Sequence, residues 1–300
     1  VVTSENIKLI AGPMKLPFLV LPPVCIFLGM ATAYAEIHRV NLTLACLALL
    51  GALAAHSSVN ALNEYLDCRS GLDARTRRTP FSGGSGVLPR RPEKAYVALI
   101  TGIVTLAICI GIGIYFVVRC GPGILPLGLV GVLLVLAYTP IVTHRPILCL
   151  IAPGLGFGLM TLGTHFVLTG TYSWPAVVAS LVPFFLVNDL LLLNQFPDRE
   201  ADQTVGRRHL LIVLGARRSS RVYAAFLIAT YLVIIAGVLT GLMPKLCLLG
   251  LLTLPGAVFA IRGACRFGTD IPKLLPSMAM NVALNLATPL LVALGFFLRA

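Results

Sequence analysis

Nine long runs of apolar residues constrain the fold of this chain more than any other feature. Each run is roughly 18 to 25 residues long, enough to cross a ~30 Å hydrocarbon core as a helix. A closed barrel, the other structure that spans membranes, would instead show weak segments of alternating hydrophobicity. The sequence therefore predicts an all-α polytopic membrane protein, one domain over residues 1–300. The predicted spans are about 17–35, 43–66, 95–118, 122–140, 147–169, 174–196, 221–242, 246–262 and 277–298.

Composition agrees with this fold class, since 58% of the residues are hydrophobic and only 11% are charged. Soluble domains carry about 25% charged residues. The first apolar run is not followed by a small-residue cleavage site, so we expect a permanent helix there. The eight cysteines are scattered without a Cys-x-x-Cys pair, and we predict neither a disulfide framework nor a zinc site.

The basic residues predict the orientation. With nine spans and a cytoplasmic N-terminus, 19 of the 23 Lys and Arg residues lie in cytoplasmic segments. The other four are Arg39, Arg119, Lys245 and Arg299. This split follows the positive-inside rule. We therefore interpret the net charge of +12 as membrane topology, and we expect no nucleic-acid partner.

Two short acidic stretches interrupt the apolar chain, each where a predicted span ends. Ionisable clusters beside hydrocarbon cost free energy unless they are paired or bind a cation, so they indicate function. The stretches follow the second and sixth spans, which suggests two four-span halves, spans 1–4 and 5–8, followed by a ninth helix. Together they hold six of the eleven acidic residues: Glu64, Asp67, Asp73, Asp198, Glu200 and Asp202.

The spacing within each stretch predicts a metal site. Residues four apart share a helix face, so Asn63 projects with Asp67, and Asn194, Asp198 and Asp202 form a second stripe. Asp73 reaches the first site only if the helix breaks near Gly71, which glycine permits. Oxygen ligands without His or Cys favour a hard cation such as Mg²⁺.

Arginines follow both stretches and predict the second half of a diphosphate site. Guanidinium groups bind phosphate through two parallel hydrogen bonds. A solvated loop in which acids and bases pair with each other is the alternative, and two matched stretches on one membrane face argue against it. The arginines are Arg75, Arg77 and Arg78 after the first stretch, and Arg199, Arg207 and Arg208 with the second.

Two further groups of polar residues lie inside predicted spans. The span at 147–169 holds four glycines with Thr161, Thr164 and His165, and small residues predict a helix-packing face. Asp189 lies in the middle of the span at 174–196. It either faces a polar cavity or bonds a neighbouring helix, and the sequence does not separate these two readings.

These motifs resemble the UbiA superfamily of intramembrane prenyltransferases over most of the chain. That family carries two motifs of the type Asn-x3-Asp-x3-Asp, matched here by Asn194-x3-Asp198-x3-Asp202 and, with a longer last spacing, by Asn63-x3-Asp67-x5-Asp73. The longer spacing is similar to the MenA-like branch, which prenylates 1,4-dihydroxy-2-naphthoate. Lysine is commoner where this chain has Arg207, and His209 replaces a usual threonine. Further matches are Tyr138-Thr139-Pro140, Gly158-Leu159-Met160-Thr161-Leu162-Gly163-Thr164 and Gly206-Arg207-Arg208-His209-Leu210.

The resemblance implies nine helices around a central cavity open to lipid, and a Mg²⁺-bridged isoprenyl diphosphate as donor. It implies that an aromatic quinone precursor or a lipid acceptor attacks the resulting allylic cation. Asp67, Asp73, Asp198 and Asp202 would bind metal, with Asp67 and Asp198 as catalytic residues. Asn63, Asn194, Arg75 and Arg208 would bind the substrate. Tyr138 would face the cation through its ring or anchor the helix at the membrane interface.

Two other classes of membrane protein, a phosphotransferase and a transporter, also use acidic residues. A CDP-alcohol phosphotransferase needs Asp-Gly-x-x-Ala-Arg and further Asp residues in one stretch, which this sequence lacks. A cation or anion transporter would use acids at repeat-related helices, and Asp189 favours it. Transporter sites usually lie near the bilayer midplane, however, whereas these motifs lie at span ends. Within the superfamily, a non-aromatic acceptor such as a glyceryl phosphate lipid stays open.

Overall fold

The computed structural model describes residues 4–298, and helix is the only regular secondary structure over this range. Eight helical segments in it are long and apolar enough to cross a membrane. The predicted all-α membrane fold is therefore confirmed. The segments are Leu16–Ile37 (η1 and α2), Leu42–Ser70 (α3), Pro92–Cys120 (η3 and α4), Pro146–Thr169 (α6), Trp174–Thr204 (α7), Leu210–Leu239 (α8), Lys245–Phe267 (η6 and α9) and Ile271–Phe297 (α10).

The predicted span at 122–140 corresponds to a shorter apolar segment, Pro122–Ala137 (η4 and α5). At 1.5 Å per residue it covers about 24 Å, less than the other segments. With it, the described residues hold a helical segment at each of the nine predicted positions. Arg299, which entered the charge count, lies outside the described residues.

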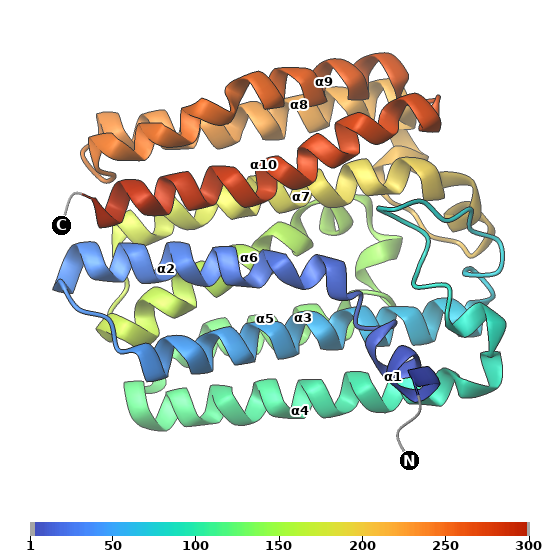
Figure 1. Cartoon of the computed structure of the whole chain (residues 1–300), viewed down its shortest axis with the longest axis horizontal. Coiled ribbons are helices and arrows are strands. Elements are labelled where there is room, and N and C mark those ends of the chain that lie inside the picture. The colour runs from blue at the N-terminus through green and yellow to red at the C-terminus, as the bar shows by residue number, and fades with distance from the viewer. Residues whose placement is uncertain (1–3, 299–300) are drawn as a thin grey trace.

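The helices run alongside one another, parallel to the long axis of the molecule (Figure 1). The short helix Ser4–Ala11 (α1), the loop after α3 and the connection between α7 and α8 all lie at one end. We call this the motif end, because α3 and α7 both carry their acidic residues there. The connection between α2 and α3 lies at the opposite end (Figure 1).

Three helices extend beyond the apolar runs that predicted them. Helix α3 continues to Ser70, α7 continues to Thr204 and α8 begins at Leu210, so the connection expected at 197–220 shrinks to residues 205–209 and a kink at Gly215, where the backbone of α8 is not helical. Hydropathy detects only the apolar part of a helix, whereas backbone hydrogen bonding continues while polar side chains project into the site or toward solvent. Both acidic motifs are consequently held largely on rigid helix.

Glycines on α6 allow α6 to pack closely against α7. A Cβ atom added to Gly154 would lie 2.0 Å from the carbonyl oxygen of Phe184, and one added to Gly158 would lie 3.2 Å from that of Ser180. The side chain of Asn188 accepts from the backbone N–H of Gly154 at 2.6 Å. The packing face predicted for this span is confirmed at these glycines. The tight α6–α7 pair forms one wall of the site described next.

Candidate functional site

The first acidic motif is shaped by the end of α3. The helix stops at Gly71, whose φ of 73° is in the left-handed region that glycine adopts freely. The backbone N–H of Leu72 donates to the carbonyl of Asp67 at 3.0 Å, which turns the chain back over the helix end. As the sequence required, the break brings Asp73 beside Asp67, and both side chains line one cavity.

The loop after this turn folds over the cavity and is tied to α3 by Glu64. This carboxylate is 1% exposed and accepts from the backbone N–H of Ser85 at 2.9 and 3.1 Å, and also from its hydroxyl. Gly84 approaches Asp73 so closely that an added Cβ would lie 2.8 Å from Oδ1. Residues 76–87 of this loop supply part of the cavity wall. Glu64 is thus bound to the loop and does not line the cavity, unlike Asp67 and Asp73.

The second motif lies on the last turns of α7. Asn194, Asp198 and Asp202 all line the same cavity as the first motif, as their four-residue spacing predicts. Asp202 accepts from His209 Nε2 at 3.0 Å. Asn194 Oδ1 and Asp198 Oδ1 are buried and have no hydrogen-bond partner. The two motifs therefore face one shared space from opposite helices.

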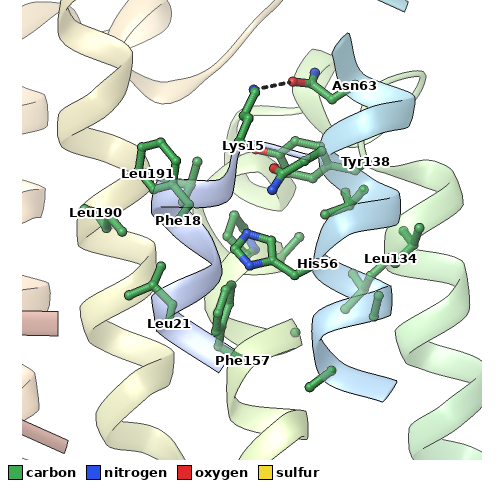
Figure 2. Close-up of a pocket in the computed structure, with 18 of the residues that line it drawn as sticks. Lys15, Phe18, Leu21, His56, Asn63, Leu134, Tyr138, Phe157, Leu190 and Leu191 are labelled. Atoms are coloured by element: carbon green, nitrogen blue, oxygen red, sulfur yellow. Dashed lines mark hydrogen bonds between the residues drawn. The ribbon is translucent and has the colours of Figure 1, made fainter. Parts of the chain in front are cut away.

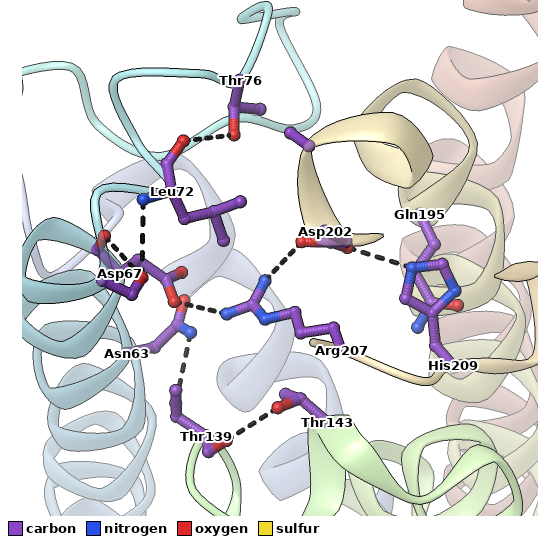
Figure 3. Close-up of polar contacts among 12 residues, drawn as sticks. Asn63, Asp67, Leu72, Thr76, Thr139, Thr143, Gln195, Asp202, Arg207 and His209 are labelled. Carbon is purple, nitrogen blue, oxygen red and sulfur yellow. Dashed lines mark hydrogen bonds and ion pairs between the residues drawn. The ribbon is translucent and has the colours of Figure 1, made fainter. Parts of the chain in front are cut away.

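Arg207 connects the two motifs directly (Figure 3). Its Nη1 donates to Asp202 Oδ1 at 2.8 Å, and its Nη2 donates to Asp67 Oδ1. Burial lowers the pKa of this guanidinium, but Asp67 and Asp202 outweigh it and hold the pKa above its ordinary value. Arg207 is therefore a fixed cation between carboxylates from the two halves of the chain.

The remaining sequence candidates separate into two groups. Asn63 accepts from Lys15 Nζ at 3.1 Å and donates to Thr139 at 3.2 Å, and Tyr138 lines the cavity beside them. Arg75 and Arg208 are exposed and do not line the cavity. Among the described residues, the Lys and Arg side chains that do reach it are Lys8, Lys15, Arg78 and Arg207.

Asp73, in the loop after α3, is shifted toward its neutral form. Burial, together with the nearby carboxylates of Glu64 and Asp67, raises the pKa of Asp73 to about 7. Its Oδ2 atom is buried without a hydrogen-bond partner. A carboxyl group held in this state favours a bound cation, because a cation offsets the same repulsion that raises the pKa.

The cavity has a volume of about 800 Å³, within the usual range for ligand pockets, and its two ends differ in chemistry. The acids, Lys15 and Arg207 line the motif end. Below them the walls are mainly apolar, with residues from α3, α4, α5 and α6, and they reach Phe116 and Val167 toward the opposite end of the bundle. Figure 2 shows the middle section, where Tyr138 lies above His56, Phe157 and Leu134. The shape suits an amphiphile with an anionic head and a long apolar tail.

The donor set fits Mg²⁺ delivered together with a phosphate ligand. Among the described residues, no group of three His, Cys, Asp or Glu side chains could hold a metal ion unaided. Four buried oxygen atoms of cavity-lining residues nevertheless lack partners: Asp73 Oδ2, Asn194 Oδ1, Gln195 Oε1 and Asp198 Oδ1. Buried polar atoms normally have partners, and Mg²⁺ commonly takes one or two carboxylates and completes its shell with waters and phosphate oxygens.

Asp189 lies apart from this cavity. It is fully buried on α7, does not line the cavity, and neither of its oxygens has a hydrogen-bond partner among the described residues. Neither reading offered by the sequence, a polar cavity or a bond to a neighbouring helix, describes it. The residue that favoured a transporter thus contributes nothing to the candidate site.

Comparisons with known proteins agree with this geometry. The UbiA prenyltransferase family pattern matches residues 21–283. The 1,4-dihydroxy-2-naphthoate octaprenyltransferase of Bacillus subtilis (strain 168) is 25% identical over 265 residues, covering 87% of this chain and 83% of that protein. The 2-carboxy-1,4-naphthoquinone phytyltransferase of Synechocystis sp. is 25% identical over 297 residues, covering 96% and 93%.

A solved structure shares the fold. The UbiA homologue of Archaeoglobus fulgidus, bound to GPP and Mg²⁺, superposes with a TM-score of 0.61 at 14% identity, covering 96% of this chain and 99% of that one. The family match covers most of the chain and includes both acidic motifs. The chain therefore belongs to the UbiA prenyltransferase family and is a prenyltransferase embedded in the membrane.

Proposed function

We propose that this enzyme transfers an isoprenyl group from a prenyl diphosphate to an aromatic quinone precursor, with Mg²⁺ as cofactor. One observation carries the proposal: acidic motifs from α3 and α7 converge on the polar end of a single cavity whose remaining walls are mainly apolar. The named naphthoate and naphthoquinone relatives support the aromatic acceptor. The Mg²⁺ and GPP bound to the Archaeoglobus fulgidus homologue support the metal and the donor class.

The residues at the motif end are suited to hold the diphosphate head. Asp67 and Asp73 from the α3 side, and Asp198 and Asp202 from α7, would hold the metal. Lys15 and Arg207 lie among them and would contact phosphate oxygens. Bound Mg²⁺ would offset the negative charge that builds on the departing diphosphate. Fixed cations already in place lower the barrier further, because they need no reorganisation during the reaction.

The rest of the reaction takes place beneath this head group. The bond between C1 of the donor and the diphosphate oxygen breaks, and its electron pair leaves with the diphosphate. The resulting allylic cation is attacked by an electron-rich ring carbon of the acceptor, which forms the new carbon–carbon bond. The ring then regains its aromaticity when that carbon loses a proton to the departed diphosphate or, where it bears a carboxylate, loses carbon dioxide. Tyr138 lines this part of the cavity and would present its ring to the cation. The apolar walls below keep water from the cation.

The basic residues support a cytoplasmic position for the motif end. Arg69, Arg75, Arg77, Arg78 and Arg90 all lie at the end of α3 or in the connection from α3 to α4, which belongs to this end (Figure 1). This clustering follows the positive-inside rule. Cysteine substitutions in the loop at 67–94 should react with a membrane-impermeant thiol reagent only after the cells are opened. Labelling in intact cells would show that the motif end faces the outside of the cell.

The activity is tested with purified protein, Mg²⁺ and isoprenyl diphosphates of several chain lengths. The acceptors are 1,4-dihydroxy-2-naphthoate, 4-hydroxybenzoate and a glyceryl phosphate lipid, with products identified by mass spectrometry. We expect prenylated naphthoate, and no product after chelation of the metal until Mg²⁺ is restored. If only the glyceryl phosphate lipid is prenylated, the acceptor is a lipid and not an aromatic compound. Full turnover in metal-free buffer would reject the role of Mg²⁺.

A further inference from the structure

His56 is an ionisable residue in the middle of the cavity that the reaction described above does not use. It lies on α3 inside a membrane span, is 8% exposed, and lines the cavity. Its Nδ1 atom is buried and has no hydrogen-bond partner. An unpaired polar atom in such a place costs free energy, so it indicates a partner that arrives with a ligand.

The position of His56 along α3 shows which ligand this is. His56 precedes Asn63 by two helical turns, so the two side chains share a face and lie about 10 Å apart along the axis. Figure 2 shows His56 below Lys15, Asn63 and Tyr138. An isoprenyl diphosphate with its head at Asn63 and Asp67 has only hydrocarbon at the depth of His56. The donor therefore cannot supply a polar partner for the imidazole, whereas the second substrate can.

The surroundings of His56 suit a flat ring. Phe157 meets the imidazole edge-on, with ring centroids 5.1 Å apart and an interplanar angle of 83°. Figure 2 shows Leu21, Leu134 and Leu190 around the same space, and all three line the cavity. Apolar walls with one hydrogen-bonding group are the usual composition of a site that orients an aromatic ligand.

From this geometry we propose that His56 binds the acceptor, by a hydrogen bond between its imidazole and a ring hydroxyl, and so selects hydroxylated aromatic acceptors. This inference rests on the proposed function and names a residue for its second substrate. A neutral imidazole can either donate to or accept from a hydroxyl. A site built to bond a hydroxyl rejects analogues that lack it, because the buried polar group is then left unpaired.

The test compares His56→Leu and His56→Gln with the wild-type protein, using 1,4-dihydroxy-2-naphthoate and geranyl diphosphate. In His56→Leu, the KM for the acceptor should rise roughly tenfold to a hundredfold, as loss of a buried hydrogen bond would cause. The KM for the donor and the Mg²⁺ requirement should stay within about twofold, because the diphosphate is held two turns away. His56→Gln, which keeps a hydrogen-bonding group, should lie between them. His144→Gln changes an exposed histidine that does not line the cavity and is the matched control.

Inhibition by the monohydroxy analogues of the acceptor gives a second readout that a purely structural role would not change. Wild-type protein should bind one analogue much more weakly than the other, and His56→Leu should bind both alike. The inference would be overturned if His56→Leu kept the wild-type KM for the acceptor and still distinguished the two analogues. It would also be overturned if the KM for the donor rose as much as the KM for the acceptor. Either result would leave the proposed function intact. Wild-type protein that prenylates no aromatic acceptor would overturn both. Donor binding measured by calorimetry confirms that each variant is folded.

Discussion

The guanidinium of Arg207 donates to the carboxylate of Asp67, a residue 140 positions earlier in the chain. The same guanidinium also pairs with Asp202. Three charged side chains from α3, α7 and the short connection after α7 are thereby held together without a ligand. The polar end of the cavity is preorganised around this contact, and the first prediction concerns it.

Replacing Arg207 should impair both stability and catalysis. Arg207→Ala leaves two buried carboxylates facing each other, and removal of one partner from a buried ion pair costs about 3–5 kcal/mol. We expect a lower midpoint of thermal unfolding in detergent and at least a hundredfold loss of kcat/KM. Arg208→Ala, one residue away but exposed, should behave like wild type. A larger effect at Arg208 than at Arg207 would show that the sequence-based candidate was the better one.

Asp198→Asn should nearly abolish prenyl transfer while the protein stays folded. The substitution keeps the shape but removes the charge from a half-buried, cavity-lining carboxylate whose Oδ1 atom is buried without a hydrogen-bond partner. Loss of one such electrostatic group commonly costs about 10²–10³ in kcat. Asp67→Asn should act similarly. Glu200→Gln changes an exposed acid on the same helix and is the control; turnover near the wild-type rate in Asp198→Asn would reject a metal-binding role.

The raised pKa of Asp73, about 7, predicts pH-dependent metal binding. Between roughly pH 4 and 7 the folded protein keeps this proton while the unfolded chain has released it. Its contribution to the free energy of unfolding therefore falls as the pH rises through that window. Mg²⁺ needs the carboxylate, so its apparent affinity should fall by up to about tenfold per pH unit below 7. Calorimetry at pH 6, 7 and 8 measures this, and Asp73→Asn should flatten the dependence. If the Mg²⁺ affinity of wild type and of Asp73→Asn changes equally with pH, the group that loses its proton on metal binding is not Asp73.

Phe116 should limit the length of donor that the cavity accepts. It lines the cavity near the far end of α4, about 30 Å of helix beyond Ala95 at the motif end. Phe116→Ala should raise kcat/KM for the longest donors relative to geranyl diphosphate. Ile114→Ala, on the same helix but 60% exposed, should leave the ratio unchanged. A chain-length profile that does not change in Phe116→Ala would mean that the tail ends elsewhere.

Much of the fold could be predicted from the sequence because hydrocarbon imposes strict lengths on apolar segments. The polar ends of the helices could not be predicted in this way. The apolar run that predicts α7 ends at residue 196, whereas the helix continues to Thr204. The four-residue spacing in each motif correctly placed Asn63, Asp67, Asn194, Asp198 and Asp202 along one cavity. Their roles in catalysis stay predictions until they are tested.

The basic residues were harder to predict, because a turn decides which of two neighbours points inward. Gly206 has a φ of 78°, and the chain that follows directs Arg207 to the carboxylates while Arg208 is exposed. Lys15 depends on a left-handed backbone (φ 53°) ahead of the first span, which no sequence pattern announces. For His56 a signal did exist: an ionisable residue inside an apolar run, two turns before Asn63 and on its helical face.

The hydrogen bonds between Glu64 and Ser85 have a consequence for the charged end of the cavity. The loop that they fasten lines the charged end of the cavity, so displacing this loop requires the hydrogen bonds between Glu64 and Ser85 to break. Breaking them would leave the buried carboxylate of Glu64 without hydrogen-bond partners, which costs free energy. The shape of the charged end therefore depends partly on Glu64, a side chain that does not itself line the cavity.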